Sequence, residues 1–293
     1  MSCCIHRIES LDLPELAPYR TMRRTAEHRE QGIFVAEGEK VVRRLLESSF
    51  PVVSVLLPEK WVAAYEPLIR ARPEPMIPVY VVTRKDVLEK LTGFSMYQGI
   101  LAVGRIPPQP SLEELLATSA RPRLFVAVDG LTNAENLGAL VRNCVAFGAQ
   151  ALVVGETCSS PFLRRAVRNS MGTIFQLPVV ESPLLLESLT RLRAAGVRCI
   201  AAHPHAEQRA LSQANLTTDC CLVFGSEGEG ISPPVLRLCE EKVAIPMAPG
   251  VDSLNVGAAA AVFLYEVHRQ RAAASARPEP PSERPALDRS LAG

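Results

Sequence analysis

The sequence has little of what marks a secreted or membrane-embedded protein. No apolar run reaches the roughly 18 to 20 residues that a membrane-spanning helix needs, and residues 1–10 contain no stretch that could serve as a signal peptide. The eight cysteines show no C-x-x-C spacing, and most lie in apolar runs, where free cysteine behaves as a small hydrophobic residue. We therefore expect a reduced, cytoplasmic protein that is neither exported nor inserted into a membrane.

Further absences narrow the classes of function. No segment recurs with a period of about 20 to 50 residues, which argues against a repeat architecture. No G-x-G-x-x-G opens a helix after the first strand, so a nicotinamide-binding Rossmann enzyme is disfavoured. His203 and His205 have no carboxylate or cysteine at ligand spacing, and we expect no metal. The net charge of +1 neither requires nor excludes a nucleic-acid partner, because such a partner responds to local charge.

Composition divides the 293 residues into two folded units. Residues 106–123 are rich in proline around a short helix-like Leu-Glu-Glu-Leu-Leu, which is typical of a linker. Residues 272–293 are too poor in large apolar side chains to pack, so we expect a disordered tail. The sequence thus predicts an amino-terminal domain over 1–105 and a second domain over 124–271.

Both units alternate short apolar runs with helical patterns, which predicts α/β layers. In the second unit the runs are apolar throughout, as parallel strands are when helices cover both faces of their sheet. In the first unit we predict strands at Ile33–Ala36, Val52–Leu57, Val79–Val82 and Gly99–Val103, with helices at Glu39–Ser48 and Trp61–Ala71. In the second unit we predict strands at Leu124–Val128, Ala151–Val154, Val197–Ala201, Cys220–Phe224 and Lys242–Ile245.

Three stretches of the second unit combine small residues with a few polar ones. The first reads Asn-Leu-Gly-Ala-Leu-Val-Arg over 136–142, and the second reads Phe-Gly-Ser-Glu-Gly-Glu-Gly over 224–230. The third, over 245–256, begins Ile-Pro-Met and ends Ser-Leu-Asn-Val. Each follows a strand candidate, and ligands of parallel sheets collect beyond the carboxyl ends of the strands. We therefore expect the three stretches to meet at one edge of the sheet, in one binding site.

Each stretch also has a purely structural interpretation. The glycines of residues 225–230 could form a tight turn, which is the favoured reading when they are taken alone. Asn136 could cap its helix, and Arg142, which has apolar neighbours, should need a partner if it is buried. Residues 253–255 could simply begin the alanine-rich helix that follows. Three such stretches in order carry more weight than each does alone.

In order and in rough spacing, the three stretches resemble motifs of the SpoU (TrmH-like) RNA 2′-O-ribose methyltransferases, a family of the SPOUT superfamily. The resemblance covers residues 124–269, and Phe34–Lys40 with Gln98–Ile100 is similar to the amino-terminal RNA-binding domain of the family. It implies an S-adenosylmethionine-dependent enzyme that works as a homodimer. It also implies a parallel sheet whose carboxyl end is tied in a deep trefoil knot, one of the exceptions to unknotted folds.

The resemblance assigns roles to single residues. The residues expected to contact the cofactor, largely through their backbone, are Gly225, Ile245 and Leu254. Arg142 matches the functional arginine of the family. Because a guanidinium is effectively always protonated, we expect it to hold a substrate phosphate and to stabilise developing oxyanion charge, while a phosphate oxygen or solvent takes the proton. The residues expected to position Arg142, the ribose or the loops are Asn136, Glu227, Ser253 and Asn255.

Two positions depart from the family pattern. Residues 132–135 read Thr-Asn-Ala-Glu where an Asp-Pro pair is frequent, and Gly257 stands where serine is common. Neither change removes a group that this mechanism needs, although Gly257 can alter how Asn255 is supported.

Contacts with RNA have to come from local charge. Residues 161–172 carry three arginines that would lie on one helix without an acid nearby in the sequence, and the Asn-Ser-Met-Gly that follows resembles a family segment near the substrate. A second group of arginines, between residues 20 and 29, is interleaved with Glu27 and Glu30 and is less decisive. The residues expected to bind RNA are Arg164, Arg165, Arg168, Asn169 and Ser170.

The two-domain layout resembles that of ribosomal RNA enzymes more than that of the single-domain transfer RNA members. It favours large-subunit ribosomal RNA as the substrate and leaves transfer RNA open. One alternative is an RNA-binding protein of the same fold that has lost catalysis, against which Arg142, Glu227 and Asn255 together argue. Another is a base methyltransferase of the same superfamily, against which the Asn-x-Gly-x-x-x-Arg pattern argues.

Overall fold

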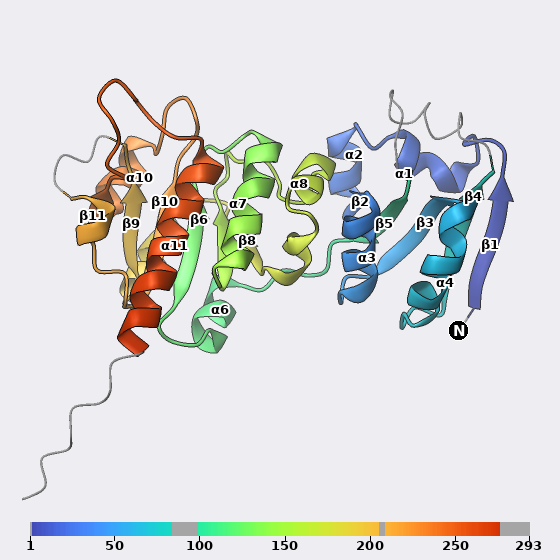
Figure 1. The fold of residues 1–293 in the computed structure, drawn as a ribbon, viewed down its shortest axis with the longest axis horizontal. Coiled ribbons are helices and arrows are strands. Elements are labelled where there is room, and N and C mark those ends of the chain that lie inside the picture. Colours follow the sequence, from blue (N-terminus) through green and yellow to red (C-terminus); the bar gives the residue numbers. More distant parts are fainter. Residues whose placement is uncertain (1, 84–98, 205–208, 276–293) are drawn as a thin grey trace, which may run out of the picture.

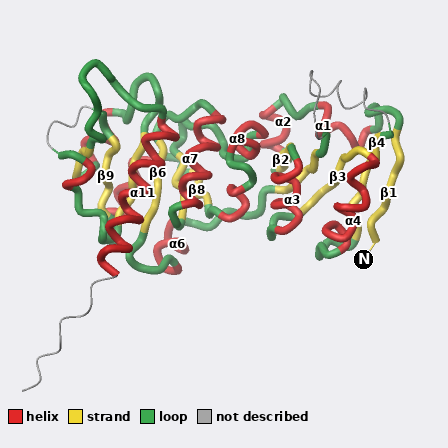
Figure 2. The backbone as a smooth tube through the Cα atoms, viewed as in Figure 1, coloured by secondary structure: helices red, strands yellow, loops and turns green. Residues whose placement is uncertain are grey.

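The apolar runs of the two units form two separate sheets. The computed structural model describes residues 2–83, 99–204 and 209–275, and its two α/β domains lie side by side along the long axis of the molecule (Figure 1). Helices and strands alternate along both domains, as the tube view shows (Figure 2). The predicted α/β class is confirmed. Within the described residues, no helix has both the length and the apolar character needed to cross a membrane.

The amino-terminal sheet is mixed, in the order β1-β4-β3-β5-β2. Strands β1, β4 and β3 run parallel, and β5 runs antiparallel to both of its neighbours. The strands are β1 (Ser2–Ile8), β2 (Ile33–Glu37), β3 (Val52–Pro58), β4 (Met76–Val82) and β5 (Leu101–Arg105). The helices are α1 (Ala17–Arg20), α2 (Thr25–Glu30), α3 (Glu39–Glu47) and α4 (Val62–Arg70). Helix α3 packs through residues that recur at helical spacing, Val41, Val42, Leu45 and Leu46.

The second sheet is parallel throughout, in the order β11-β9-β10-β6-β7-β8. Its strands are β6 (Leu124–Val128), β7 (Ala151–Val154), β8 (Val179–Glu181), β9 (Arg198–Ala202), β10 (Cys220–Phe224) and β11 (Glu241–Val243). The helices of this half are α6 (Leu112–Thr118), α7 (Ala134–Ala146), α8 (Arg164–Asn169), α9 (Leu185–Ala194), α10 (Pro233–Leu238) and α11 (Val256–Ser275). The parallel sheet predicted for this domain is confirmed.

Helices cover both faces of the second sheet, which explains why its strands are apolar throughout. Along β6, Leu124, Val126 and Val128 belong to the core under α7 and α11. The alternate residues Phe125 and Ala127 belong to the core under α9 and α10. All five side chains are buried, so no position of this strand faces water and no polar alternation can appear in the sequence.

The two domains share a hydrophobic core. Phe34 and Phe50 of the amino-terminal domain meet Phe162 and Phe175 of the second domain, with ring centroids 5.3 to 6.1 Å apart. Helix α6 lies between the two domains in the sequence, and it packs two leucines on the second sheet. The helix-like part of the predicted linker therefore belongs to the core of the second domain.

Each predicted strand has a counterpart whose bounds lie within three residues of the prediction, and two strands were not predicted. Strands β6, β7 and β10 have the predicted bounds, whereas β1 and β8 are absent from the prediction. Strand β8 has three residues, too few to show a pattern. Helix α11 runs to Ser275 and takes in the first residues of the predicted tail, and residues 276–293 lie outside the described part. The deep knot stays a prediction.

Candidate active site

The three stretches meet at the carboxyl edge of the second sheet. They follow β6, β10 and β11, and the third leads into α11. The side-chain amide of Asn136 donates a hydrogen bond to the carboxylate of Glu227, and Asn255 Nδ2 donates to Asn136 Oδ1 at 2.9 Å. One residue of each stretch thus belongs to a single hydrogen-bond chain. The expectation that the stretches come together is confirmed.

The start of α7 leaves the Asn136 side chain free to take part in this hydrogen-bond chain. Its cap is Asn133, whose Oδ1 accepts from the backbone N–H groups of Glu135 at 2.9 Å and Asn136 at 3.1 Å. The interpretation of Asn136 as the helix cap is therefore wrong. Its amide instead donates to one side chain and accepts from another, which fixes the orientation of the amide.

Asn255 performs two tasks at the start of α11. Its Oδ1 accepts from the backbone N–H of Gly257 at 2.9 Å, as a cap does, while its Nδ2 holds Asn136. Asn143 of α7 donates to the carbonyl of Gly257 at 2.7 Å. Capping and contact with the first stretch therefore coexist, and α7 and α11 are tied together next to the hydrogen-bond chain.

The glycine-rich second stretch is a closed turn. Ser226 and Gly230 exchange two backbone hydrogen bonds of 3.0 and 3.2 Å. A Cβ on Gly225 would stand 2.0 Å from the carbonyl carbon of Gly230 and 2.2 Å from the nitrogen of Ile231. The crossing of the turn itself thus requires glycine at position 225, whatever the ligand.

A cavity of about 490 Å³ lies between this turn and the third stretch. We name it the motif cavity. Small-molecule sites typically have volumes of about 300 to 1,000 Å³, with mainly apolar walls and a few polar groups. Phe224 and Phe263, which meet edge to face at 5.7 Å, form part of the apolar wall. The predicted site residues in its lining are Gly225, Glu227, Ile245, Ser253 and Leu254.

The charged groups that line the motif cavity are carboxylates. Glu227, Glu229 and Asp252 all contribute to it and are exposed, and no lysine or arginine among the described residues lines it. His203 also lies in the lining, while His205 lies outside the described residues. In the described part of the chain, no three His, Cys, Asp or Glu side chains group as metal ligands would. This charge distribution favours a ligand that carries positive charge.

Arg142 is exposed, and within the described residues it makes no hydrogen bond or ion pair. Because the Arg142 side chain is exposed, its guanidinium does not need the partner within the protein that burial would require. Arg142 lies six residues after Asn136 on α7, or about 9 Å further along the helix axis. An unpaired guanidinium at this distance from the hydrogen-bond chain is available to an anionic ligand.

Helix α8 crosses α7 within the first stretch. A Cβ on Gly138 would stand 2.4 Å from the carbonyl oxygen of Ala166 and 2.8 Å from Asn169 Cβ, so glycine allows the two helices to touch. The contact places Arg165 and Asn169, which are both exposed, beside the first stretch. Arg165, like Arg142, has no ion-pair partner in the part of the chain that the structure describes.

The other two arginines of α8 face the amino-terminal domain. Glu37 of β2, whose side chain is 4% exposed, accepts from Arg164 and from Arg168, the latter at 2.8 Å. The expectation that this cluster has no acid nearby is therefore wrong. Glu37 contacts it in the folded protein, although it lies 127 residues from Arg164 in the sequence. Ser170 is buried and donates its hydroxyl to the Val167 carbonyl at 2.8 Å, so its side chain does not reach the surface.

Sequence reasoning missed the roles of Glu37 and Asn143. Glu37 lies in the segment 34–40 that was noted for its resemblance, but nothing local indicates that its partners come from the other domain. Asn143 directly follows Arg142, and its bond to Gly257 depends on how α7 and α11 pack. Neither contact has a signal in a single sequence.

Comparison with known proteins gives concordant matches. The SpoU rRNA methylase family matches residues 123–265. An uncharacterized tRNA/rRNA methyltransferase of Mycobacterium bovis is 32% identical over 239 residues, which are 80% of this chain and 81% of that protein.

Two solved structures match most of this chain. The SpoU methyltransferase AviRb from Streptomyces viridochromogenes, in complex with the cofactor AdoMet, is 25% identical with a TM-score of 0.73, over 88% of this chain and 99% of that one. A structure described as an RNA 2′-O ribose methyltransferase is 28% identical with a TM-score of 0.74, over 91% of this chain and 100% of that one.

Proposed function

Because the chain belongs to the SpoU family of RNA methyltransferases, we propose that it methylates a ribose 2′-hydroxyl of RNA, with large-subunit ribosomal RNA as the first candidate substrate and transfer RNA as the second. The hydrogen-bond chain from Glu227 through Asn136 to Asn255 carries the proposal, because it joins the three stretches beside the motif cavity. The neighbour described as an RNA 2′-O ribose methyltransferase supports ribose as the acceptor.

The lining of the motif cavity fits S-adenosylmethionine as the cofactor. This molecule supplies an activated methyl group on a positively charged sulfur. The carboxylates of Glu227, Glu229 and Asp252 stabilise positive charge, and the apolar wall suits an adenine ring. Ile245 and Leu254 flank the cavity from the third stretch and would hold the cofactor largely through backbone groups, together with Gly225. The AdoMet complex of AviRb supports this assignment.

Arg142 would act on the RNA. The cofactor already activates the methyl group. The protein therefore mainly has to align the 2′-hydroxyl, provide an acceptor for the hydroxyl proton and exclude water. A guanidinium does not act as a base, but it binds a phosphate through two parallel N–H groups and stabilises negative charge on a nearby oxygen. Arg142 would therefore hold the phosphate next to the reacting ribose, and a phosphate oxygen or solvent would take the proton.

The hydrogen-bond chain would keep the acceptor side of the site rigid. The carboxylate of Glu227 is an acceptor only, so the amide of Asn136 has to turn its nitrogen towards Glu227 and its oxygen towards Asn255. The arrangement fixes the first turn of α7 and the start of α11. Ser253, which lines the motif cavity, would support the ribose or the loop that leads into α11.

The RNA would lie over α8 as well as over the first stretch. Arg165, Arg168 and Asn169 expose their side chains there, and the Gly138 crossing holds α8 against α7. Arg165 has a free guanidinium within the described residues, and Arg168 is 53% exposed although it contacts Glu37. Of the arginines assigned to RNA, Arg164 is the one most committed to the protein, because its side chain is only 18% exposed.

A homodimer would suit the outer face of α11. Val262 and Tyr265 expose 40% and 54% of their surface on this helix, which also packs on the α7 of Arg142. Large apolar side chains grouped on an exposed face are typical of an interface. Analytical ultracentrifugation tests this part of the proposal: Tyr265→Glu should yield a monomer if the face is buried between two copies.

The decisive experiment is methyl transfer from radiolabelled S-adenosylmethionine to unmodified ribosomal and transfer RNA. Arg142→Ala should lower the transfer rate by about 10²- to 10³-fold, as the loss of one stabilising donor does, with cofactor affinity unchanged. Arg142→Lys keeps the charge but loses the two-pronged geometry, so it should restore only part of the rate. Arg7→Ala, at an arginine 64% exposed on the far strand β1, is the matched control and should transfer at the wild-type rate.

The position of the label decides the chemistry. Methylation of a ribose makes the adjoining linkage resistant to alkali, so the label should appear in alkali-resistant dinucleotides from one class of RNA. If alkali instead releases the label in mononucleotides, the methylated group is a base, and the ribose assignment is refuted. Failure to bind S-adenosylmethionine would favour a non-catalytic RNA-binding protein.

A further inference from the structure

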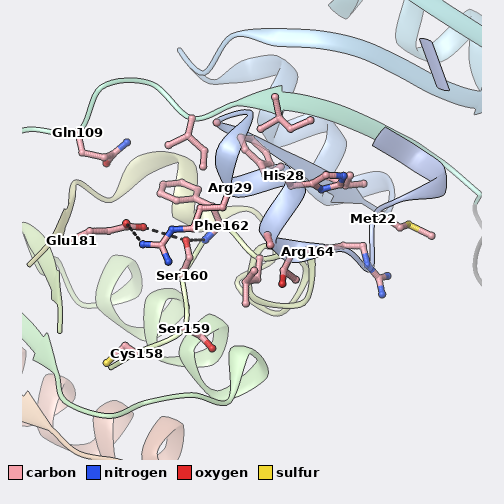
Figure 3. Close-up of a pocket in the computed structure, with 18 of the residues that line it drawn as sticks. Met22, His28, Arg29, Gln109, Cys158, Ser159, Ser160, Phe162, Arg164 and Glu181 are labelled. Carbon is pink, nitrogen blue, oxygen red and sulfur yellow. Dashed lines mark hydrogen bonds and ion pairs between the residues drawn. The ribbon is translucent and has the colours of Figure 1, made fainter. Parts of the chain in front are cut away.

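A second cavity, which we name the interdomain cavity, lies between the two domains. Its volume is about 840 Å³, larger than the roughly 490 Å³ of the motif cavity. It is lined by α2 and the start of β2, by residues 106–111 of the linker, by residues 158–164 before and within α8, and by the end of β8 (Figure 3). Both domains contribute to its walls, so the cavity depends on how they pack together.

The strand order places the interdomain cavity next to the active site. The motif cavity lies beyond β9, β10 and β11, and the first stretch follows β6. The interdomain cavity lies beyond β7 and β8, through residues 158–164 and Glu181. The first stretch therefore lies between the two cavities. Because adjacent strands are about 4.8 Å apart, each cavity is only a few strand spacings from it. In Figure 1, α7, α8 and α2 follow one another from the second domain towards the amino-terminal domain.

One wall of the interdomain cavity is bonded to the loop before α7. The hydroxyl of Ser159 donates to the Thr132 carbonyl at 2.6 Å, and the Ser159 N–H donates to the Leu131 carbonyl at 3.0 Å. Thr132 directly precedes Asn133, the cap of α7. The loop that leads to Asn136 is therefore bonded directly to the wall of the interdomain cavity.

The lining suits a base that has left its stack. Ile106 and Leu163 are half-buried and contribute apolar surface. Gln109 contributes an amide, and the hydroxyls of Ser159 and Ser160, which donate within the protein, can accept a hydrogen bond from a base edge. Sequence-specific recognition of RNA mostly uses such unstacked bases, held between apolar side chains and hydrogen-bonding groups.

Arg29 supplies a cation at the mouth that can change partner. Figure 3 shows it reaching from α2 towards Glu181, with which it forms an ion pair of 3.4 Å. Its side chain is 74% exposed and that of Glu181 42%, and exposed pairs of this kind contribute little stability. Ser160 Oγ also donates to Glu181 at 3.2 Å, so the carboxylate keeps a partner when Arg29 leaves. Arg164, in contrast, is held by the buried Glu37.

We propose that the interdomain cavity receives an unstacked nucleotide of the RNA, close in the strand to the methylated one, and that Arg29 binds its phosphate. The inference rests on the proposed function, which makes RNA the substrate. The amino-terminal domain would then recognise which base stands at this position of the RNA, in addition to enlarging the contact area.

Two variants test the cavity, each with a matched control. Arg29→Ala removes the phosphate contact, and Arg24→Ala removes an equally exposed arginine beside the same helix, which pairs with Glu27 and does not line the cavity. Ala26→Trp fills the cavity from an exposed position on α2, and Ala63→Trp makes the same change at an exposed alanine of α4. Thermal unfolding of all four variants would check that they keep the fold.

The measurement is the dissociation constant for unmodified large-subunit ribosomal RNA, and then for unmodified transfer RNA, at several salt concentrations. Arg29→Ala should weaken binding about five- to tenfold and lower the slope of log Kd against log salt by roughly 0.7 to 1, the value for one phosphate contact. Ala26→Trp should weaken binding by a similar factor with the slope unchanged, because it removes no charge. Both controls should match the wild type.

Methyl transfer measured in parallel separates this inference from the proposed function. If the wild type methylates RNA while Arg29→Ala and Ala26→Trp bind as their controls do, the cavity proposal is wrong and the proposed function stands. If the wild type binds RNA without transferring a methyl group, the proposed function is wrong, and the affinities and slopes still decide on the cavity. A wild type that binds neither RNA overturns both.

Discussion

Replacing Gly225 with alanine tests whether the geometry of the second stretch shapes the motif cavity. The new Cβ would stand 2.0 Å from the Gly230 carbonyl carbon, whereas non-bonded carbons rest at about 3.5 to 4.0 Å. The turn would have to open by about 1.5 Å. This movement breaks the two backbone hydrogen bonds between Ser226 and Gly230, each of which contributes about 0.5 to 1.5 kcal/mol. We expect a total loss of about 1 to 3 kcal/mol from the closed form of the turn.

Two glycines of the same turn serve as graded controls. A Cβ on Gly228 meets no atom within 4 Å, and its φ lies outside the left-handed region, so Gly228→Ala should be nearly neutral. A Cβ on Gly230 is equally free, but its φ of +71° is strained for alanine and costs about 1 kcal/mol. The expected order of damage is Gly228→Ala, then Gly230→Ala, then Gly225→Ala.

Calorimetric titration with S-adenosylmethionine measures the effect. A loss of 1 to 3 kcal/mol corresponds to roughly 5- to 150-fold in the dissociation constant, provided that the cofactor binds only the closed turn. Thermal unfolding of each variant separates lost binding from lost fold. Wild-type affinity in Gly225→Ala would refute the reasoning, and an equal loss in Gly228→Ala would show that the crossing at position 225 is not the cause.

Two further predictions concern the amino-terminal domain. Glu37→Gln removes the buried charge that pairs with Arg164 and Arg168, so the free energy of unfolding in urea should fall by about 3 kcal/mol. Glu59→Gln makes the same change at a carboxylate that is 51% exposed in its pair with Arg7, so it should cost less than about 1 kcal/mol. Burial lowers the pKa of His28 from 6.5, so the folded state resists a proton that the unfolded chain accepts. Stability should therefore be complete above about pH 6.5 and fall as the pH drops below it, and His28→Gln should flatten this fall in thermal unfolding between pH 7 and 5.

The sequence was most informative where one physical cause acts over a few neighbouring residues. Burial on both faces makes β6, β7 and β10 continuous apolar runs, and their bounds are the predicted ones. The meeting of the three stretches followed from a general property of parallel sheets, since each stretch comes after a strand. Strand β8 was missed because three residues carry no periodicity.

Glycines show where local reasoning stops. A glycine in a polar stretch indicates that some atom comes close to the backbone, but it does not identify that atom. At Gly225 the close atoms belong to Gly230 and Ile231, and at Gly138 they belong to Ala166 and Asn169 of α8. Both glycines lie in stretches expected to bind a ligand, yet in both the backbone of the protein itself is what excludes a side chain. The lack of a side chain at these two positions therefore acts on the site indirectly, through the shape of the turn and the position of α8.

The arginines of α7 and α8 show the same limit for charge. Spacing places all three arginines of α8 on a short helix, and it treats them alike as candidates for phosphate. The fold divides them, because the buried Glu37 of the other domain holds Arg164 and Arg168 and leaves Arg165 without a partner in the described structure. A buried carboxylate needs such partners, so the domain contact takes up part of the positive charge that RNA could use. On these two helices, the guanidinium groups that remain fully available to a phosphate are those of Arg142 and Arg165.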